Sequence, residues 1–264
     1  MRRGLAPTRE RARADIAAGR VLVGGAVADK PARLVDAGEP VQLAGPPPRF
    51  VSRGGEKLDA ALERLDIDVA GRTALDAGAS TGGFTDCLLQ RGAAHVVAVD
   101  VGHGQLDVRL RQDPRVEVME RTNVRDLTVG SLPGAPFDVV TADLAFVSLR
   151  RVAPVLTALA APGADVIVLV KPQFEAGRVE ASKGRGVIRD PEVWRRALLG
   201  VRDAFEGSAA AMMGLMVSPL RGANGNVEFL AHFRRPTTRP AVTDDELAAA
   251  VTEAESHAWG RRSP

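Results

Sequence analysis

Two lysines and two acidic residues of this chain suit proton-transfer chemistry, both by their type and by their position. Asp143 ends a strand-like run, and Lys171 directly follows the five apolar residues 166–170. Lys57 lies at the start of a predicted helix, and Glu228 lies on the last predicted strand. Only four of the 35 basic residues are lysines, and a lysine can release its proton whereas an arginine cannot. We therefore expect Lys57, Asp143, Lys171 and Glu228 to form one catalytic set.

The reaction that such a set suits best is methylation of a ribose 2′-hydroxyl. This hydroxyl is a poor nucleophile, so it must be oriented and partly deprotonated as it attacks a sulfonium methyl group. Desolvation and the nearby charge of Lys57 would favour a neutral amine on Lys171, which could then act as the base. Asp143 and Glu228 would orient the two amines. For each of these residues taken alone, an ordinary surface ion pair is the alternative.

A second chemical feature is the small-residue segment 75–84, Leu-Asp-Ala-Gly-Ala-Ser-Thr-Gly-Gly-Phe, between a predicted strand and a predicted helix. Small residues let the backbone approach a ligand, and the helix N-terminus offers unpaired amide donors. The segment is not G-x-G-x-x-G, and Asp76 would repel a pyrophosphate but suit the amino group of a methionine-derived cofactor. S-adenosylmethionine therefore fits better than NAD, and a tight turn without a ligand is the alternative.

The residues expected to bind this cofactor lie in that segment and after the next two strands. Asp100 ends the following strand and is placed to hold ribose hydroxyls. Asn123 follows the third strand and could meet the adenine, with ordinary loop capping as an equal alternative. The segment itself contributes Asp76, Gly78, Ser80, Thr81, Gly82, Gly83 and Phe84.

Several other kinds of site are excluded. The Asp-Leu-Ala-Phe motif at 143–146 lacks the Pro-Pro-aromatic pattern typical of methylation at an exocyclic amine. Cys87 is the only cysteine and is expected in the core, which excludes a disulfide framework and a cysteine-built zinc site. The four histidines have no metal-ligand spacing, so we expect no metal.

Basic residues are concentrated at the N-terminus, which points to a nucleic acid. Residues 1–53 hold ten basic and five acidic residues, although the whole chain has a net charge of only +2. The expected phosphate contacts are Arg2, Arg3, Arg9, Arg11, Arg13, Arg20 and Arg33, with Lys183 and Arg185 in the later loop 177–190. No aromatic residue lies among these arginines, so helical RNA is favoured over stacked single-stranded bases. A solvated basic helix and an ordinary surface loop are the alternatives.

The composition indicates a soluble cytoplasmic protein with no membrane contact. Hydrophobic residues make up 45% of the chain and charged residues 26%, and the longest strongly apolar run is the five residues 166–170. That run is far shorter than a membrane-spanning segment, and the N-terminus lacks the apolar stretch of a signal peptide. We expect a monomer.

Strand and helix patterns alternate from residue 72 onward, which predicts an α/β fold. Strands are expected at 73–77, 95–100, 115–119, 137–142 and 165–170, helices at 84–91, 104–111, 148–160 and 191–205, and a closing hairpin at 211–218 and 227–233. This order indicates a Rossmann-like, mostly parallel sheet with a closing antiparallel hairpin and the ligand at the carboxyl ends of its strands. The expected domains are a small α+β RNA-binding domain at 1–45, a linker at 46–56, a catalytic domain at 57–235, and a C-terminal linker and helix at 236–264.

Five motifs together resemble the TlyA family of ribosomal RNA 2′-O-methyltransferases, some members of which are named hemolysins. They are Ser-Arg-Gly-Gly-Glu-Lys-Leu at 52–58, the segment 76–84, Asp-Leu-Ala-Phe-Val-Ser-Leu at 143–149, Val-Lys-Pro-Gln-Phe-Glu at 170–175 and Gly-Asn-Val-Glu-Phe at 225–229. The resemblance covers nearly the whole chain. The linker departs from it, because Pro-Arg-Phe-Val at 48–51 stands where some members carry Arg-x-Trp-Val.

The resemblance implies an FtsJ/RrmJ-like methyltransferase domain behind an N-terminal domain like that of ribosomal protein S4. It implies S-adenosylmethionine as cofactor and ribosomal RNA or ribosomal subunits as partner. Lys57, Asp143, Lys171 and Glu228 would be the catalytic tetrad, with Asp143 and Phe146 also beside the cofactor or target. A non-catalytic RNA-binding ribosome factor and a membrane-lytic protein are the alternative functions.

Overall fold

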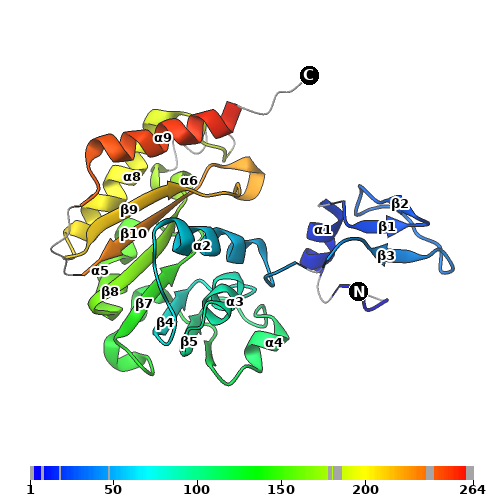
Figure 1. Cartoon of the computed structure of the whole chain (residues 1–264), viewed down its shortest axis with the longest axis horizontal. Coiled ribbons are helices and arrows are strands. Elements are labelled where there is room, and N and C mark those ends of the chain that lie inside the picture. Colours follow the sequence, from blue (N-terminus) through cyan, green and yellow to red (C-terminus); the bar gives the residue numbers. More distant parts are fainter. Residues whose placement is uncertain are drawn as a thin grey trace. The chain divides into compact units, whose positions relative to one another are not determined.

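The structure is a computed structural model that describes residues 3–6, 9–17, 19–46, 48–177, 180, 186–235 and 241–259. It divides into an N-terminal unit, Met1–Ser52, and a C-terminal unit, Arg53–Pro264. Figure 1 shows both units, and each is described by itself.

The N-terminal unit is one helix with a small antiparallel sheet. Its elements are α1 (Arg9–Ala17), β1 (Val21–Val23), β2 (Ala26–Val27) and β3 (Val41–Leu43), with strand order β2-β1-β3. Gly24 and Gly25, with φ of 59° and 84°, form the turn between β1 and β2. Two positive φ values in a two-residue turn match the twist of a hairpin, so β1 and β2 form one.

The C-terminal unit is built on a seven-stranded sheet of order β6-β5-β4-β7-β8-β10-β9. The strands are β4 (Thr73–Ala77), β5 (His95–Val99), β6 (Val116–Met119), β7 (Phe137–Ala142), β8 (Ala160–Val170), β9 (Ala211–Val217) and β10 (Phe229–Arg234). The first five in this order are parallel, whereas β10 pairs antiparallel with both β8 and β9. The predicted Rossmann-like sheet with a closing hairpin is confirmed.

Helices cover both faces of this sheet. They are α2 (Arg53–Arg64), α3 (Gly83–Gln90), α4 (Val108–Arg111), α5 (Leu149–Leu159), α6 (Pro172–Glu175), α8 (Pro191–Glu206) and α9 (Asp244–Trp259), with short 3₁₀ turns η1 (Val124–Asp126), η2 (Val129–Ser131) and η3 (Ala223–Gly225). Helix α2 packs on α3, and α5 packs on α8 (Figure 1). Right-handed crossovers place α3 and α5 on opposite faces, because the strand order runs in opposite directions from β4.

Three helices, α4, α9 and α2, differ from what the sequence predicts. The helix expected at 104–111 is only α4, because the Asp107 side chain caps it by accepting a hydrogen bond from Arg109 N at 2.9 Å. Helix α9 belongs to the C-terminal unit rather than to a separate tail, since Leu247 and Ala254 are fully buried in its core. Helix α2 begins at Arg53, four residues before Lys57.

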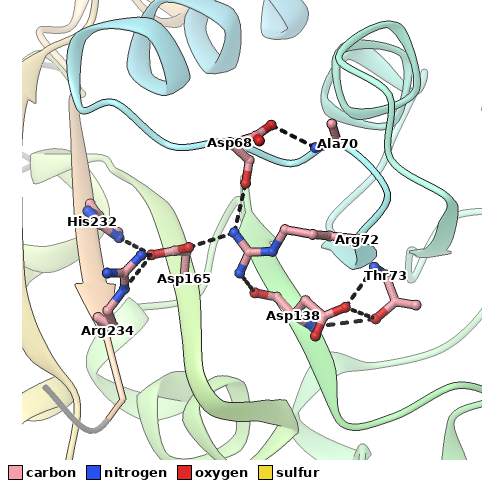
Figure 2. Close-up of polar contacts among 8 residues, drawn as sticks. All are labelled: Asp68, Ala70, Arg72, Thr73, Asp138, Asp165, His232 and Arg234. Carbon is pink, nitrogen blue, oxygen red and sulfur yellow. Dashed lines mark hydrogen bonds and ion pairs between the residues drawn. The ribbon is translucent and has the colours of Figure 1, made fainter.

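A buried carboxylate joins the strands at the amino end of the parallel sheet. Asp165 of β8 is 1% exposed, and it accepts hydrogen bonds from His232 Nε2 at 2.8 Å, Arg234 Nε at 2.9 Å and Arg72 Nη1 at 2.7 Å (Figure 2). Arg72, which precedes β4, also donates to the carbonyl oxygen of Asp138 in β7. The network therefore links β4, β7, β8 and β10. These hydrogen bonds hold the pKa of Asp165 well below its ordinary value despite burial.

Replacing this carboxylate should destabilise the fold. Asp165→Asn leaves Arg72 and Arg234 facing a neutral side chain, and we expect a loss of about 3 kcal/mol in the free energy of unfolding by urea denaturation. A lowered native pKa gives stability that is present above the unfolded value near 3.9 and lost as the pH falls below it. The wild type should therefore lose stability in that acidic range, and Asp165→Asn should lose less.

The matched control is Glu253→Gln, which removes the exposed pair of Glu253 with Arg64 at 2.9 Å. Surface pairs contribute about 0–1 kcal/mol, so this variant should unfold close to the wild type. Equal effects of the two substitutions would contradict a special role for Asp165.

Candidate active site

The small-residue segment after β4 lies directly against the end of β7. A Cβ atom added at Gly78, where φ is +88°, would lie 2.6 Å from the carbonyl oxygen of Asp143. Asp143 N donates to the carbonyl oxygen of Ala77 at 3.1 Å, which holds the two strand ends together. Gly82 is equally constrained, since an added Cβ would lie 2.2 Å from Leu110 Cδ1. Both glycines are required by close approach and by positive φ.

Asp76 lies beneath this segment rather than in the cavity beside it. Its carboxylate is fully buried and accepts hydrogen bonds from Thr85 Oγ1 at 2.6 Å and Thr141 Oγ1 at 3.3 Å. Burial raises the pKa of Asp76 to about 7, and the nearby charge of Asp143 adds to this rise. The sequence expectation placed Asp76 against an amino group of the ligand, whereas here the threonine hydroxyls occupy its carboxylate.

The carboxylate of Asp100, like that of Asp76, accepts hydrogen bonds from other parts of the chain, and here they link two loops. Its two carboxylate oxygens accept hydrogen bonds from Ser80 N at 2.8 Å and Gly102 N at 2.6 Å. Ser80 has a positive φ of 49°, so this hydrogen bond fixes a backbone conformation that is uncommon outside glycine. The expected contact of Asp100 with ribose hydroxyls would have to use the remaining lone pairs of these oxygens.

The expected catalytic set lies at the carboxyl ends of β7 and β8 as two ion pairs. Lys171 Nζ is 2.5 Å from Asp143 Oδ1, and Lys57 Nζ is 2.5 Å from Glu228 Oε2. The last ladder pair of β8 and β10 is Val170 with Phe229, so Lys171 and Glu228 stand one step beyond it on facing strands. Lys57 reaches this point from α2. The structure therefore brings together residues that are up to 171 positions apart.

All four side chains are well shielded from solvent. The exposed fractions are 11% for Lys57, 3% for Glu228, 13% for Lys171 and 25% for Asp143. Asp143 Oδ1 is itself buried, and it meets Lys171 as an ion pair without a hydrogen bond of standard geometry. Gly222 leaves room for Glu228, because a Cβ there would lie 2.0 Å from Glu228 Oε1. Shielding of this kind strengthens electrostatic interactions and makes the pairs unlike ordinary surface pairs.

A cavity of about 1050 Å³ opens at this end of the sheet. Of the residues expected at the site, Gly78, Asn123, Asp143 and Phe146 line it. Thr81, Gly82, Gly83 and Phe84 support the loop and the start of α3 instead. Asn123 Oδ1 caps η1 by accepting from Arg125 N at 3.1 Å, so the capping alternative is correct for that oxygen.

Sequence reasoning missed a clamp that supports one wall of the cavity. Glu175 of α6 accepts hydrogen bonds from Ser148 Oγ at 2.5 Å and Leu149 N at 2.8 Å, which ties α6 to the start of α5. Burial raises the pKa of Glu175 above its ordinary value, and the Ser148 hydrogen bond limits the rise. Phe146, 92% exposed with φ of 64°, lies on Phe174 with ring centroids 5.3 Å apart. The only sign of this clamp in the sequence is the acidic residue that ends the motif at 170–175.

The expected RNA-binding arginines divide into two groups. Arg3 donates to the carbonyl oxygens of Asp36 and Ala37. Arg20 pairs with Asp15 at 3.6 Å, and Arg33 pairs with Glu39 at 3.1 Å. These three arginines therefore also stabilise the N-terminal unit. Arg9 and Arg13 are exposed on α1. Arg2, Lys183 and Arg185, and the side chain of Arg11, lie outside the described residues.

The described residues hold neither a metal-binding cluster nor a membrane-spanning helix. No group of three histidine, cysteine, aspartate or glutamate side chains in those ranges is arranged to hold a metal ion. No helix in the same ranges has the length and apolar character needed to cross a membrane.

Comparisons with known proteins agree with this geometry. The sequence matches the FtsJ-like methyltransferase family over residues 50–235 and the S4 domain over residues 2–41. It is 48% identical to the 16S/23S rRNA (cytidine-2′-O)-methyltransferase TlyA of Mycobacterium tuberculosis (strain CDC 1551 / Oshkosh), over 97% of this chain and 95% of that protein. It is 44% identical to YqxC of Bacillus subtilis (strain 168), named as a candidate rRNA methyltransferase, over 96% and 90%.

A solved structure from Streptococcus thermophilus, named as a candidate hemolysin, superposes with a TM-score of 0.80. It is 38% identical and covers 97% of this chain and 93% of that one. The shared fold, the two matched domains and the near-complete alignments leave one conclusion: this chain belongs to the TlyA family, with an S4 domain followed by an FtsJ-like methyltransferase domain.

Proposed function

We propose that this protein transfers a methyl group from S-adenosylmethionine to a ribose 2′-oxygen of ribosomal RNA. The observation that carries the proposal is the pair of shielded lysine–carboxylate contacts, Lys171 with Asp143 and Lys57 with Glu228, at the cavity end of the sheet. The relative from Mycobacterium tuberculosis is named as an rRNA (cytidine-2′-O)-methyltransferase. A binding factor without catalysis would have no need for two lysines held out of solvent.

The residues around the cavity fit S-adenosylmethionine. At Gly78 there is no room for a side chain, so the backbone itself forms the wall, and Asp143 Oδ1 is buried beside it. Gly78, Asn123 and Asp143 line a volume of about 1050 Å³, ample for a nucleoside with a methionine chain. When bound there, S-adenosylmethionine would supply an electrophilic methyl group on its sulfonium sulfur.

Lys171 is the proposed base. The ammonium of Lys171 would first release its proton to solvent. The neutral Nζ then accepts the proton of the 2′-hydroxyl while the ribose oxygen forms its bond to the methyl carbon and the sulfur–methyl bond breaks. The resulting ammonium is stabilised by Asp143, 2.5 Å away. Lys57 is held by Glu228, which directly precedes β10. Its ammonium group provides a second positive charge close to the ribose oxygen. Asp143 and Glu228 thus fix both amines before substrate arrives, which reduces the reorganisation needed in the transition state.

The S4 domain supports ribosomal RNA as the substrate, and ribosomal RNA lies in the cytoplasm. Arg9 and Arg13 on α1 are exposed basic residues suited to a phosphate backbone. The name hemolysin of a related structure has no counterpart among the described helices, none of which could cross a membrane.

Replacing the proposed base should stop catalysis but leave the cofactor site intact. General acid–base groups contribute about 10²–10⁴-fold, so Lys171→Ala should lower methyl incorporation into ribosomal subunits at least about 100-fold. Lys171→Arg should be equally inactive, because a guanidinium keeps its proton. Calorimetric binding of S-adenosylhomocysteine should stay within about threefold of the wild type, since Gly78 and Asn123 remain in place.

The control is Arg196→Ala, an exposed residue of α8 outside the cavity lining, which should methylate like the wild type. Full activity of Lys171→Arg would remove the proposed proton acceptor. A wild-type protein that binds ribosomal RNA but methylates none of its particles would favour the non-catalytic alternative.

Alanine substitution at Gly78 and at Gly71 should separate the effect of crowding at the cofactor site from the effect of backbone strain. Gly78 and Gly71 have similar positive φ values, +88° and +71°, but only Gly78 has neighbours within 4 Å of an added Cβ. Both alanine variants should lose about 1–2 kcal/mol of stability from the left-handed backbone. Gly78→Ala should in addition weaken S-adenosylhomocysteine binding by about tenfold or more, because the loop must move from Asp143. Equal binding by the two variants would place the cofactor elsewhere.

A further inference from the structure

Helix α5 begins with two arginines that oppose its own dipole. Arg150 and Arg151 are its second and third residues, and its first turn has no acidic side chain. Acidic residues do stand in the first turns of α2, α3, α8 and α9. Positive charge near a helix N-terminus is unfavourable, by about 0.3–1 kcal/mol in exposed positions. The two arginines therefore do not serve the stability of α5.

Both arginines are exposed and line the 1050 Å³ cavity, together with exposed Arg125 of η1. Within the described part of the chain, no carboxylate lies at ion-pair distance from any of these three residues. Eight other arginines in the described part of the C-terminal unit do have such partners, namely Arg64, Arg72, Arg91, Arg109, Arg111, Arg115, Arg202 and Arg234. Among the residues described, the three guanidinium groups at the cavity thus lack a carboxylate partner, and Arg125 Nε donates only to the neutral Asn123 Oδ1 at 3.2 Å.

The clamp at Glu175 explains how α5 tolerates this charge. Glu175 accepts a hydrogen bond from Leu149 N, and the charge of Arg150 limits the rise in its pKa that burial causes, although the two residues form no ion pair. Ser148 Oγ accepts from Arg150 N at 3.3 Å as the N-cap. The side chains of Glu175 and Ser148 thus accept hydrogen bonds from the first two backbone N–H groups of α5. The guanidinium groups of Arg150 and Arg151 are left for an external anion.

We propose that Arg125, Arg150 and Arg151 form a phosphate-binding rim that holds the RNA backbone next to the target ribose. Three positive charges from two separate elements exceed what the single carboxylate of the cofactor could neutralise. Successive phosphates of one RNA strand carry the charge and the spacing to meet η1 and α5 together. This rim would be a second RNA contact, separate from the S4 domain, and it rests on the proposed function because RNA is taken as the substrate.

The test uses the full chain with Arg151→Gln and the double variant Arg150→Gln/Arg151→Gln. Filter binding of ribosomal RNA is measured between 50 and 200 mM salt, together with the KM for ribosomal subunits. Loss of each charged hydrogen bond to phosphate should weaken RNA binding about tenfold. The double variant should also reduce the slope of log K against log salt by about 1.5. Affinity for S-adenosylhomocysteine should not change.

Thermal unfolding gives a readout that a structural role would not produce. Because Arg151 opposes the helix dipole, Arg151→Gln should melt at the same temperature as the wild type or higher, even though RNA binding weakens. The matched control is Arg115→Gln, an exposed arginine that is paired with Asp113 at 2.7 Å and lies outside the cavity lining. It should leave RNA affinity and the salt slope as in the wild type.

Two results would overturn the rim. One is an unchanged salt slope in the double variant, and the other is weakened S-adenosylhomocysteine binding with normal RNA binding, which would assign the arginines to the cofactor. Failure of the proposed function is distinguishable, because RNA binding and its salt slope are measured without turnover. A wild type that never methylates RNA, but whose double variant loses the salt slope, would keep the rim and reject the reaction.

Discussion

The active end of this fold depends on how its opposite end is fixed. Asp165 gathers Arg72, Arg234 and His232 at the amino end of the parallel strands, and so fixes β8 against its neighbours (Figure 2). Strand β8 runs parallel to β7 and antiparallel to β10. The register of these pairs at the amino end therefore decides which residues face each other at the carboxyl end of β8. A one-residue slip would turn every side chain of a strand to the other face. The contact of Lys171 with Asp143 thus depends on a network that takes no part in the chemistry.

The two lysines of the proposed catalytic set are held by carboxylates that belong to other elements. Lys171 follows β8 and meets the end of β7, whereas Lys57 comes from α2 and meets Glu228 before β10. Each pair therefore forms only when the sheet and α2 are assembled. Removing two ammonium groups from bulk water is costly, and the carboxylates offset this cost. Two glycines beside them, Gly78 and Gly222, leave room where the backbone of Asp143 and the side chain of Glu228 approach.

The sequence was sufficient for the succession of strands along the chain and for the closing hairpin, because apolar periodicity marks these positions directly. It also singled out Lys57, Asp143, Lys171 and Glu228, which form two ion pairs and whose catalytic role stays a prediction. It was insufficient for Asp76 and Asp100. Asp76 lies within β4 and Asp100 directly follows β5, and their carboxylates turn toward Thr85 and toward the backbone of Ser80. Periodicity locates a residue on an element, whereas the direction of its side chain is decided by which nearby donor would otherwise be left unsatisfied. Glu175 was missed for the same reason, since its partners lie 26 and 27 positions away.

Charge placement in the C-terminal unit separates groups that stabilise the fold from groups that face outward. An arginine that pairs with a nearby carboxylate, such as Arg115 with Asp113, neutralises its own surroundings and presents little field to a ligand. The effect is opposite for an arginine in the first turn of a helix whose N-terminus is already capped by other side chains, because its charge is then not neutralised and presents a field to a ligand. Arg151 adds positive potential at a cavity wall, and among the described residues no carboxylate pairs with it. Since such an arrangement lowers the stability of α5, its physical consequence is attraction of an anion to that wall.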